Sequence, residues 1–203
     1  MIVSLTAPSP TASPRVILPF GSIDRFLSRE AMEDHRQIFE GYLAALLRLQ
    51  QQKIAVPEES RPDSGFRSAS LQKQRCQNAV VLHQTFFESL FPTPTEMPKA
   101  VERMLAKHFG SPTRALSHLR AAALCVPTGW AVLSYDPLMD AMQVLTLTDH
   151  DTGVVFRQVA LLAIDVWEHA YFADWGRDRK GYLDGFFAHI DWDFFQKRLD
   201  RRS

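Results

Sequence analysis

Two long stretches in the first half of the chain place hydrophobic residues at the spacing of an amphipathic helix. The first runs from about residue 29 to residue 52, and Ser28 before it is a good N-cap. Its apolar positions are Met32, Phe39, Tyr42, Leu43, Leu46, Leu47 and Leu49, with His35 in the same stripe. The second runs from about residue 71 to residue 91, and its apolar face comprises Val80, His83, Phe87 and Leu90. The pattern therefore predicts two long helices, each with one histidine on its buried side.

The rest of the chain contains shorter helical patterns and three strand-like runs. Residues 54–69 are rich in proline and charge, which predicts a loop. Helices are predicted over 98–109 and 112–123, strands over 129–135, 142–148 and 158–164, and a helical end in which Tyr182, Phe186, Phe187, Ile190 and Phe194 pack inward. Strands that follow one another, rather than alternating with helices, predict an antiparallel sheet and the α+β fold class.

The same pattern divides the chain into three parts. Residues 1–17 contain several prolines and small polar residues, which predict a flexible tail. Residues 18–97 form the predicted N-terminal helical hairpin domain. Residues 98–203 form the predicted C-terminal α/β domain, in which helices flank a three-stranded antiparallel sheet.

The composition of the chain disfavours some classes of function but does not by itself indicate one. The chain has 203 residues, 46% of them hydrophobic, and 23 Lys plus Arg balance 23 Asp plus Glu. Zero net charge gives no reason to expect a nucleic-acid partner. We expect no membrane association, because no apolar run approaches the length of a span, and no basic region precedes an apolar core as in a secretory signal. Cys76 and Cys125 do not make a disulfide framework, so we expect a cytoplasmic protein with reduced thiols.

One short stretch near the C-terminus offers candidate metal chemistry. Asp165 and His169 follow directly after the apolar run 159–164, which has the length of a buried strand. A carboxylate and an imidazole four residues apart at the end of a strand can converge on one point. An oxygen and a nitrogen ligand together suit Fe, Mn or Zn. The spacing alone is also common in proteins where the two residues are only structural.

The amino-acid sequence of this stretch is more specific than the spacing of Asp165 and His169. Residues Asp165 to Tyr171 read Asp-Val-Trp-Glu-His-Ala-Tyr, which closely resembles the signature of the iron/manganese superoxide dismutase family. The resemblance implies a homodimeric enzyme that disproportionates superoxide, a small anion, at one Fe or Mn ion per subunit. It also implies that Asp165 and His169 are two of four protein ligands, and that one further histidine comes from each helix of the hairpin.

The hairpin contains a candidate for each of these histidines. Residues 30–35 read Glu-Ala-Met-Glu-Asp-His and resemble the family's Glu-Thr-Met-Glu-Phe-His, which makes His35 the first ligand by resemblance. Residues 82–87 resemble the family's Asn-His-Thr-Phe-Tyr-Trp in two registers, of which one places His83 and the other Gln84 at the ligand position. We favour His83 because it shares the apolar face of its helix, and Gln84 remains the alternative.

Residues around the predicted metal are assigned by the same resemblance. Glu168 corresponds to the family residue that reaches a metal-bound histidine across the dimer interface. His150 lies where other members place the residue that contacts the metal-bound solvent, and an exposed loop histidine is the other reading. Tyr42 falls seven residues after His35, against eight for the family's gateway tyrosine, so it is either that gateway or a core residue. Trp130 and Trp167 match tryptophans that wall the pocket, although core packing explains both equally well.

Other positions depart from the family and keep a second hypothesis open. Many members have an interface histidine where this chain has Ile38 and Phe39, and the tyrosine that pairs with it is Phe172 here. These changes are compatible with a non-catalytic, superoxide-dismutase-like structural or partner-binding protein. A zinc hydrolase on the same ligands is a weaker hypothesis, because the sequence shows no obvious general base beside the site.

Overall fold

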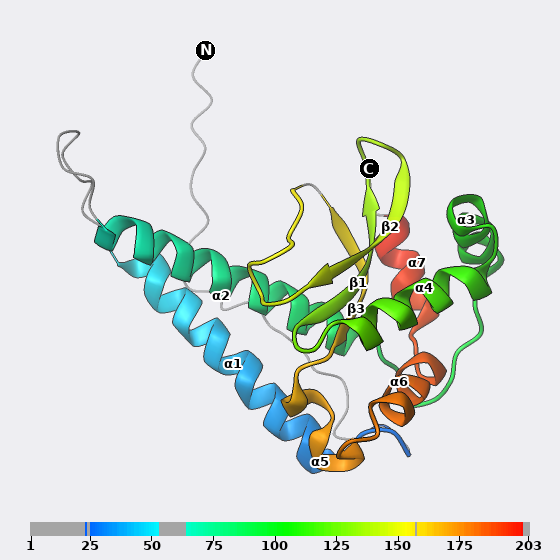
Figure 1. The fold of residues 1–203 in the computed structure, drawn as a ribbon, viewed down its shortest axis with the longest axis horizontal. Coiled ribbons are helices and arrows are strands. Elements are labelled where there is room, and N and C mark those ends of the chain that lie inside the picture. The colour runs from blue at the N-terminus through cyan, green and yellow to red at the C-terminus, as the bar shows by residue number, and fades with distance from the viewer. Residues whose placement is uncertain (1–22, 24, 53–63, 157, 201–203) are drawn as a thin grey trace.

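A computed structural model describes residues 23, 25–52, 64–156 and 158–200 (Figure 1). The predicted tail at 1–17 therefore lies outside the described residues. The described chain contains two long helices, then two shorter helices, a three-stranded sheet and a helical end. Among the helices that are described, none combines the length and apolar character needed to cross a membrane.

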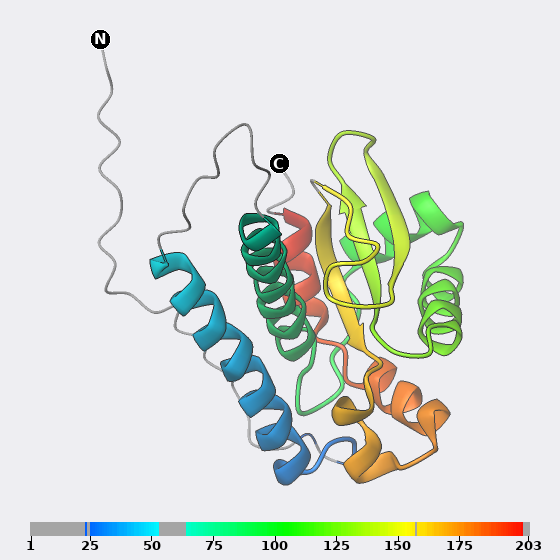
Figure 2. The same cartoon turned by 60° about the vertical axis from the view of Figure 1, so that its left-hand side comes forward.

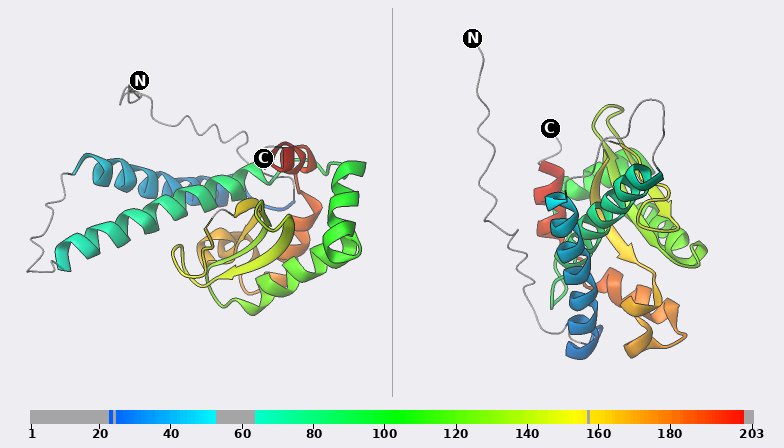
Figure 3. Two further views of the ribbon diagram at one scale, coloured as in Figure 1. Left: turned by 90° about the horizontal axis from the view of Figure 1, so that it is seen from above. Right: turned by 90° about the vertical axis from the view of Figure 1, so that its left-hand side faces the viewer.

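Helices α1 (Arg29–Gln51) and α2 (Ser64–Glu88) form the hairpin and lie side by side in both views of Figure 3. The α1 helix begins as predicted, because the Ser28 hydroxyl accepts a hydrogen bond from the main-chain N–H of Ala31 at 3.1 Å. The α2 helix begins at Ser64, so the prediction of a loop through residue 69 was wrong for its last six residues. Residues 64–69 contain no proline, so nothing in them removes a main-chain donor and the helix extends through them.

Helices α3 (Lys99–Phe109) and α4 (Pro112–Cys125) follow the hairpin as the sequence predicts. Gly110 ends α3 in the left-handed region, with φ of 86°. Ser111 then caps α4 by accepting the main-chain N–H of Arg114 at 3.1 Å. In the view of Figure 2, these two helices lie on one side of the sheet and the hairpin lies on the other.

The sheet confirms the α+β fold class. Strands β1 (Trp130–Asp136), β2 (Ala141–Leu147) and β3 (Val159–Asp165) are antiparallel in the order β2-β1-β3. Because β1 is the central strand, its first residue, Trp130, lies opposite Asp165, the last residue of β3. This register brings the indole of Trp130 to the same end of the sheet as the predicted Asp165 ligand.

The C-terminal region consists of a short 3-10 turn, η1 (Glu168–Ala170), and helices α5 (Phe172–Trp175), α6 (Arg179–Ala188) and α7 (Trp192–Asp200). Tyr182, Phe186 and Ile190 are buried as predicted. The inward-facing residue of α7 is Phe195, not Phe194, because the buried positions of this helix are 192, 195 and 199. Phe194 is only half-buried and lies under the guanidinium of Arg198, 5.4 Å from its ring centre.

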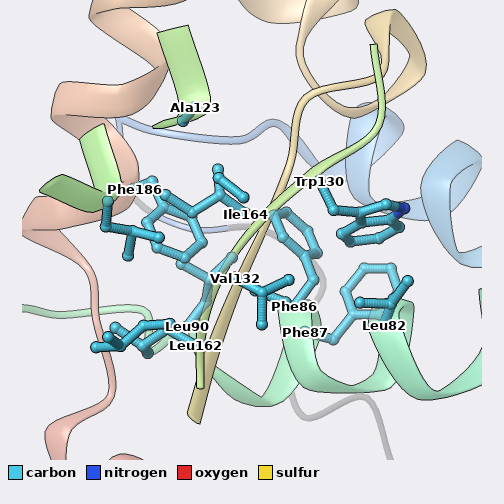
Figure 4. Close-up of a cluster of buried hydrophobic side chains, with 14 of the residues drawn as sticks. Leu82, Phe86, Phe87, Leu90, Ala123, Trp130, Val132, Leu162, Ile164 and Phe186 are labelled. Carbon is cyan, nitrogen blue, oxygen red and sulfur yellow. The ribbon is translucent and has the colours of Figure 1, made fainter. Parts of the chain in front are cut away.

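A continuous hydrophobic core joins the hairpin to the sheet and the C-terminal helices (Figure 4). The labelled side chains come from α2, α4, β1, β3 and α6, and from Leu90, which follows α2 and forms an isolated bridge with Ile190. They are Leu82, Phe86, Phe87, Leu90, Ala123, Trp130, Val132, Leu162, Ile164 and Phe186. Phe86 and Phe87 follow His83 on α2, so the packing that buries these rings also sets the position of the histidine.

Candidate metal centre

Four side chains from both halves of the chain converge at one end of the sheet. They are His35 on α1, His83 on α2, Asp165 at the end of β3 and His169 in η1. Their candidate ligand atoms all lie within 4.8 Å of one another. The Asp165 Oδ2 atom lies 3.1 Å from Nε2 of His35, 3.2 Å from Nε2 of His169 and 3.8 Å from Nε2 of His83. Three imidazoles therefore present the same ring nitrogen to one carboxylate oxygen.

Local hydrogen bonds orient the Asp165 carboxylate toward the three rings. Its Oδ1 atom accepts the main-chain N–H of Trp167 at 2.9 Å, which leaves Oδ2 for the histidines. The main-chain carbonyl of Asp165 accepts a hydrogen bond from the Tyr182 hydroxyl at 2.8 Å. The end of the strand is thus held at both its side chain and its backbone.

His83 provides the clearest sign that these residues suit a metal. Its Nδ1 atom lies 2.7 Å from the Ala79 carbonyl, and because a carbonyl only accepts, Nδ1 must carry the proton. Burial lowers the pKa of His83 to about 3, so the ring is neutral and its Nε2 atom has a lone pair. That buried Nε2 has no hydrogen-bond partner among the described residues. A metal ion would satisfy a buried acceptor of this kind.

The charges of the other ligand candidates also suit a cation. Burial alone would raise the pKa of Asp165, but hydrogen bonds with His169 and His35 hold it below its ordinary value, so the group is an anion. Burial lowers the pKa of His35, which keeps that imidazole neutral. One carboxylate and neutral imidazoles are a donor set suited to Fe, Mn or Zn.

The cluster has one side that faces solvent. The side chains of His35, His83 and Asp165 are at most 1% exposed, whereas that of His169 is 26% exposed. A small ion can therefore approach along the His169 side, while the other three groups remain dry.

Tyr42 and His150, which the sequence left open, lie together beside the cluster. The indole N–H of Trp130 donates to Nδ1 of His150 at 3.0 Å, so Nδ1 is an acceptor and the neutral ring carries its proton on Nε2. That Nε2–H donates to the hydroxyl oxygen of Tyr42 at 3.0 Å. Both rings have their centres 5.6 Å from the centre of the His83 ring. His150 is only 2% exposed, so it is not an exposed loop histidine.

The remaining predicted residues differ in how close they come. The Trp167 ring is nearly parallel to that of His169, with 6.4 Å between their centres. Glu168 is exposed next to His169 in sequence. Gln84 does not reach the cluster, since its amide donates to the Glu88 carboxylate at 3.0 Å. One residue further along a helix turns the side chain by about 100°, so His83 and Gln84 cannot both point at the same centre.

Arg75 is a residue that the sequence did not single out. It lies on α2, two turns before His83. Its guanidinium donates to Oδ2 of Asp149 at 2.5 Å. Asp149 precedes His150 in the loop after β2. A basic residue upstream of His83 and an acidic pair around His150 were both visible in the sequence. Only the tertiary structure shows that they meet.

Comparison with known proteins decides between families that use such a donor set. Residues 97–198 match the family model described as iron/manganese superoxide dismutases, C-terminal domain. The chain belongs to the iron/manganese superoxide dismutase family. Membership confirms the resemblance of the Asp165–Tyr171 stretch, and this family implies a single Fe or Mn ion per subunit, which the His-His-Asp-His cluster fits.

Curated relatives are named superoxide dismutases. The chain is 34% identical over 124 residues to superoxide dismutase (Mn) 1 of Halobacterium salinarum, a match that covers 61% of this chain and 62% of the relative. It is 28% identical over 195 residues to superoxide dismutase (Fe) of Methanothermobacter thermautotrophicus, covering 92% of this chain and 93% of the relative. The chain thus spans less than two thirds of the first superoxide dismutase relative and nearly all of the second.

Proposed function

We propose that this protein is a superoxide dismutase, an oxidoreductase that converts two superoxide ions and two protons to oxygen and hydrogen peroxide. His35, His83, Asp165 and His169 would hold one Fe or Mn ion. The observation that carries the proposal is the convergence of these four groups within 4.8 Å, with the lone pair of His83 Nε2 left without a partner among the described residues. When bound, Fe or Mn would supply the one-electron exchange that the reaction needs.

The residues of the chain select the substrate and exclude competing chemistry. The side chains of His35, His83 and Asp165 are almost fully buried, so water and larger molecules are kept from three sides of the centre. Among the four groups of the cluster, the partly exposed His169 is the one that a ligand from solvent can reach. A small anion such as superoxide suits a centre that is exposed on one side.

Tyr42 and His150 are placed to supply protons. Because His150 donates its Nε2–H to the Tyr42 oxygen, the hydroxyl hydrogen of Tyr42 is not used in that contact. This hydrogen is free to be donated toward the substrate or a solvent molecule, and the Trp130 indole holds His150 in the tautomer that makes this possible. Trp130 and Trp167 therefore act as residues that hold the site, and Tyr42 and His150 as its proton donors.

The structure does not favour the non-catalytic alternative. A scaffold would have no need for two buried imidazoles and a third, partly exposed one around a buried carboxylate, because unpaired buried polar atoms cost stability. We further propose a cytoplasmic homodimer without nucleic-acid or membrane partners. A second copy would cover the exposed Glu168 and Phe172, the latter 53% exposed beside the His169 turn.

Removal of the Tyr42 hydroxyl should lower activity without removing the metal. We expect Tyr42→Phe to retain Fe or Mn and to consume superoxide roughly 10–100-fold more slowly, because residues outside the ligand set have effects of this size. Metal per subunit by plasma mass spectrometry and superoxide decay after pulse radiolysis measure the two effects. Tyr135→Phe is the matched control, since that hydroxyl binds Asp140 at the far end of β1, and it should leave both values unchanged.

The function itself is tested on the unmodified protein. Near-stoichiometric Fe or Mn in protein purified without added metal, together with rapid superoxide consumption, is the expected result. A well-folded dimer that contains no metal and leaves superoxide untouched would support the scaffold instead. Stoichiometric zinc without turnover would contradict the redox assignment.

A further inference from the structure

Asp149 joins two elements beside the metal centre through a single carboxylate. Its Oδ2 atom accepts from Nη1 of Arg75, on α2, at 2.5 Å. Its Oδ1 atom accepts the main-chain N–H of His150 at 2.7 Å. Burial alone would raise the pKa of Asp149, but the hydrogen bonds from Arg75 and from the His150 N–H hold it below its usual range. The ionised carboxylate therefore ties α2 to the backbone of the residue whose ring contacts Tyr42.

Arg75 also acts on the other member of this pair. The hydrogen bond with Asp149 raises the pKa of Arg75 most, and a weaker interaction with the Tyr42 hydroxyl raises it further. Tyr42 lies on α1, Arg75 on α2, and Asp149 with His150 in the loop after β2. The Arg75 guanidinium thus connects α2 to the loop that carries His150 and to Tyr42 on α1, while Trp130 on β1 holds the His150 ring.

The charge balance argues against Arg75 as a binding site for the substrate anion. Asp149 and Asp151 both face its guanidinium, the latter at 3.9 Å, so the local charge is not positive. The Arg75 side chain is 37% exposed, and ion pairs at such positions contribute little to folding. The contacts of the pair therefore point to a role in positioning.

We propose that the Arg75–Asp149 pair positions His150 and Tyr42 for proton delivery at the metal centre, an inference that rests on the proposed dismutase function. Without the pair, the loop that carries His150 loses its attachment to α2. The His150–Tyr42 hydrogen bond then loosens, and the hydroxyl hydrogen of Tyr42 is no longer held in place. Small displacements of a proton donor have large effects on rate.

Arg75→Gln, Asp149→Asn and the double variant test the pair in the metal-loaded protein. We expect unchanged metal content, a kcat about tenfold lower in each single variant, and a double variant no slower than either. The value of kcat/KM and its dependence on ionic strength should change less than kcat, because a positioning residue does not steer the anion. Arg75→Lys, which can still reach Asp149, should retain most of the activity.

Arg120→Gln is the matched control. Its guanidinium pairs with Asp184 at 2.6 Å and has a similar side-chain exposure of 31%, but it lies on α4, outside the site. We expect it to behave as the unmodified protein. Amide hydrogen exchange gives a second readout: peptides covering 148–156 should exchange faster in both single variants and not in Arg120→Gln.

Several results would overturn the inference. These are an unchanged kcat in Arg75→Gln, strictly additive losses in the double variant, a loss confined to kcat/KM that disappears at high salt, or unchanged exchange of 148–156. Failure of the proposed function is a separate result, because it shows as an unmodified protein that binds metal without consuming superoxide. The exchange measurement then decides alone whether the pair holds the His150 loop.

Discussion

We expect His83→Ala to yield protein that contains almost no Fe or Mn. Superoxide should decay no faster in its presence than in buffer alone. The side chain of His83 is fully buried, and its Nε2 atom, 3.8 Å from Asp165 Oδ2, supplies the contribution of α2 to the cluster. Its removal takes away one of the four proposed ligands and leaves an empty space beside a buried anion. Loss of a ligand of this kind removes both affinity and geometry. Metal analysis after purification and a superoxide assay measure the outcome.

Gln84→Ala is the control that distinguishes the two registers of α2. The Gln84 amide donates to Glu88, away from the cluster, so this variant should keep its metal and its activity. His83→Gln removes the imidazole while keeping most of the volume, and it should lose metal as His83→Ala does. Full occupancy in the His83 variants, or loss of metal in Gln84→Ala, would contradict the assignment of His83. Circular dichroism checks that each variant is folded.

We expect Gly129→Ala to lower the free energy of unfolding by more than about 2 kcal/mol, because the substitution combines backbone strain with a steric clash. Gly129 has φ of 117°, a conformation that side chains disfavour, and a Cβ atom there would lie 1.9 Å from the Leu147 carbonyl oxygen. Its own carbonyl accepts the main-chain N–H of Val166 at 2.9 Å. A shift at Gly129 therefore also disturbs Trp130 and the end of β3, so bound metal should fall with stability. Urea unfolding followed by circular dichroism measures the change.

Gly41→Ala is the matched control for that variant. Gly41 lies within α1 and a Cβ atom there meets nothing within 4 Å. Alanine favours a helix over glycine, so we expect this variant to be more stable by roughly 0.5–1 kcal/mol. If Gly129→Ala and Gly41→Ala lowered the free energy of unfolding by the same amount, strain and steric clash at Gly129 would not explain the loss of stability.

Much of the fold was predictable because local patterns specify it. The stripe on α1 and the Ser28 cap predicted the start and the buried face of that helix, and both are observed. The strands follow from apolar runs bounded by turns, and their grouping was enough for the α+β class. The errors lie where local signals are weak. The first turns of α2 contain Gly65 and three serines, which are weaker helix formers than alanine. The inward face of α7 was predicted one residue away from where it lies, at Phe194 instead of Phe195.

The candidate site divides in the same way. The stretch around Asp165 and His169 could be recognised from the sequence, because its residues are contiguous and form a motif that is specific to a family. The sequence alone could not decide whether His83 or Gln84 occupies the ligand position on α2, since a shift of the alignment by one residue preserves most of the similarity. The structure separates them by direction: His83 faces Asp165 and Gln84 faces Glu88.

By itself, then, the sequence determined the elements, their order and the family signature. It also determined three of the four groups of the cluster, namely His35, Asp165 and His169. Only the tertiary structure decided that Tyr42 and His150, more than a hundred residues apart, share a hydrogen bond, and that Arg75 meets Asp149. The physical reason is the range of the forces concerned. Propensity, capping and hydrophobic periodicity act between near neighbours in the chain, whereas a ligand's direction and a hydrogen-bond partner depend on how distant segments pack into one core.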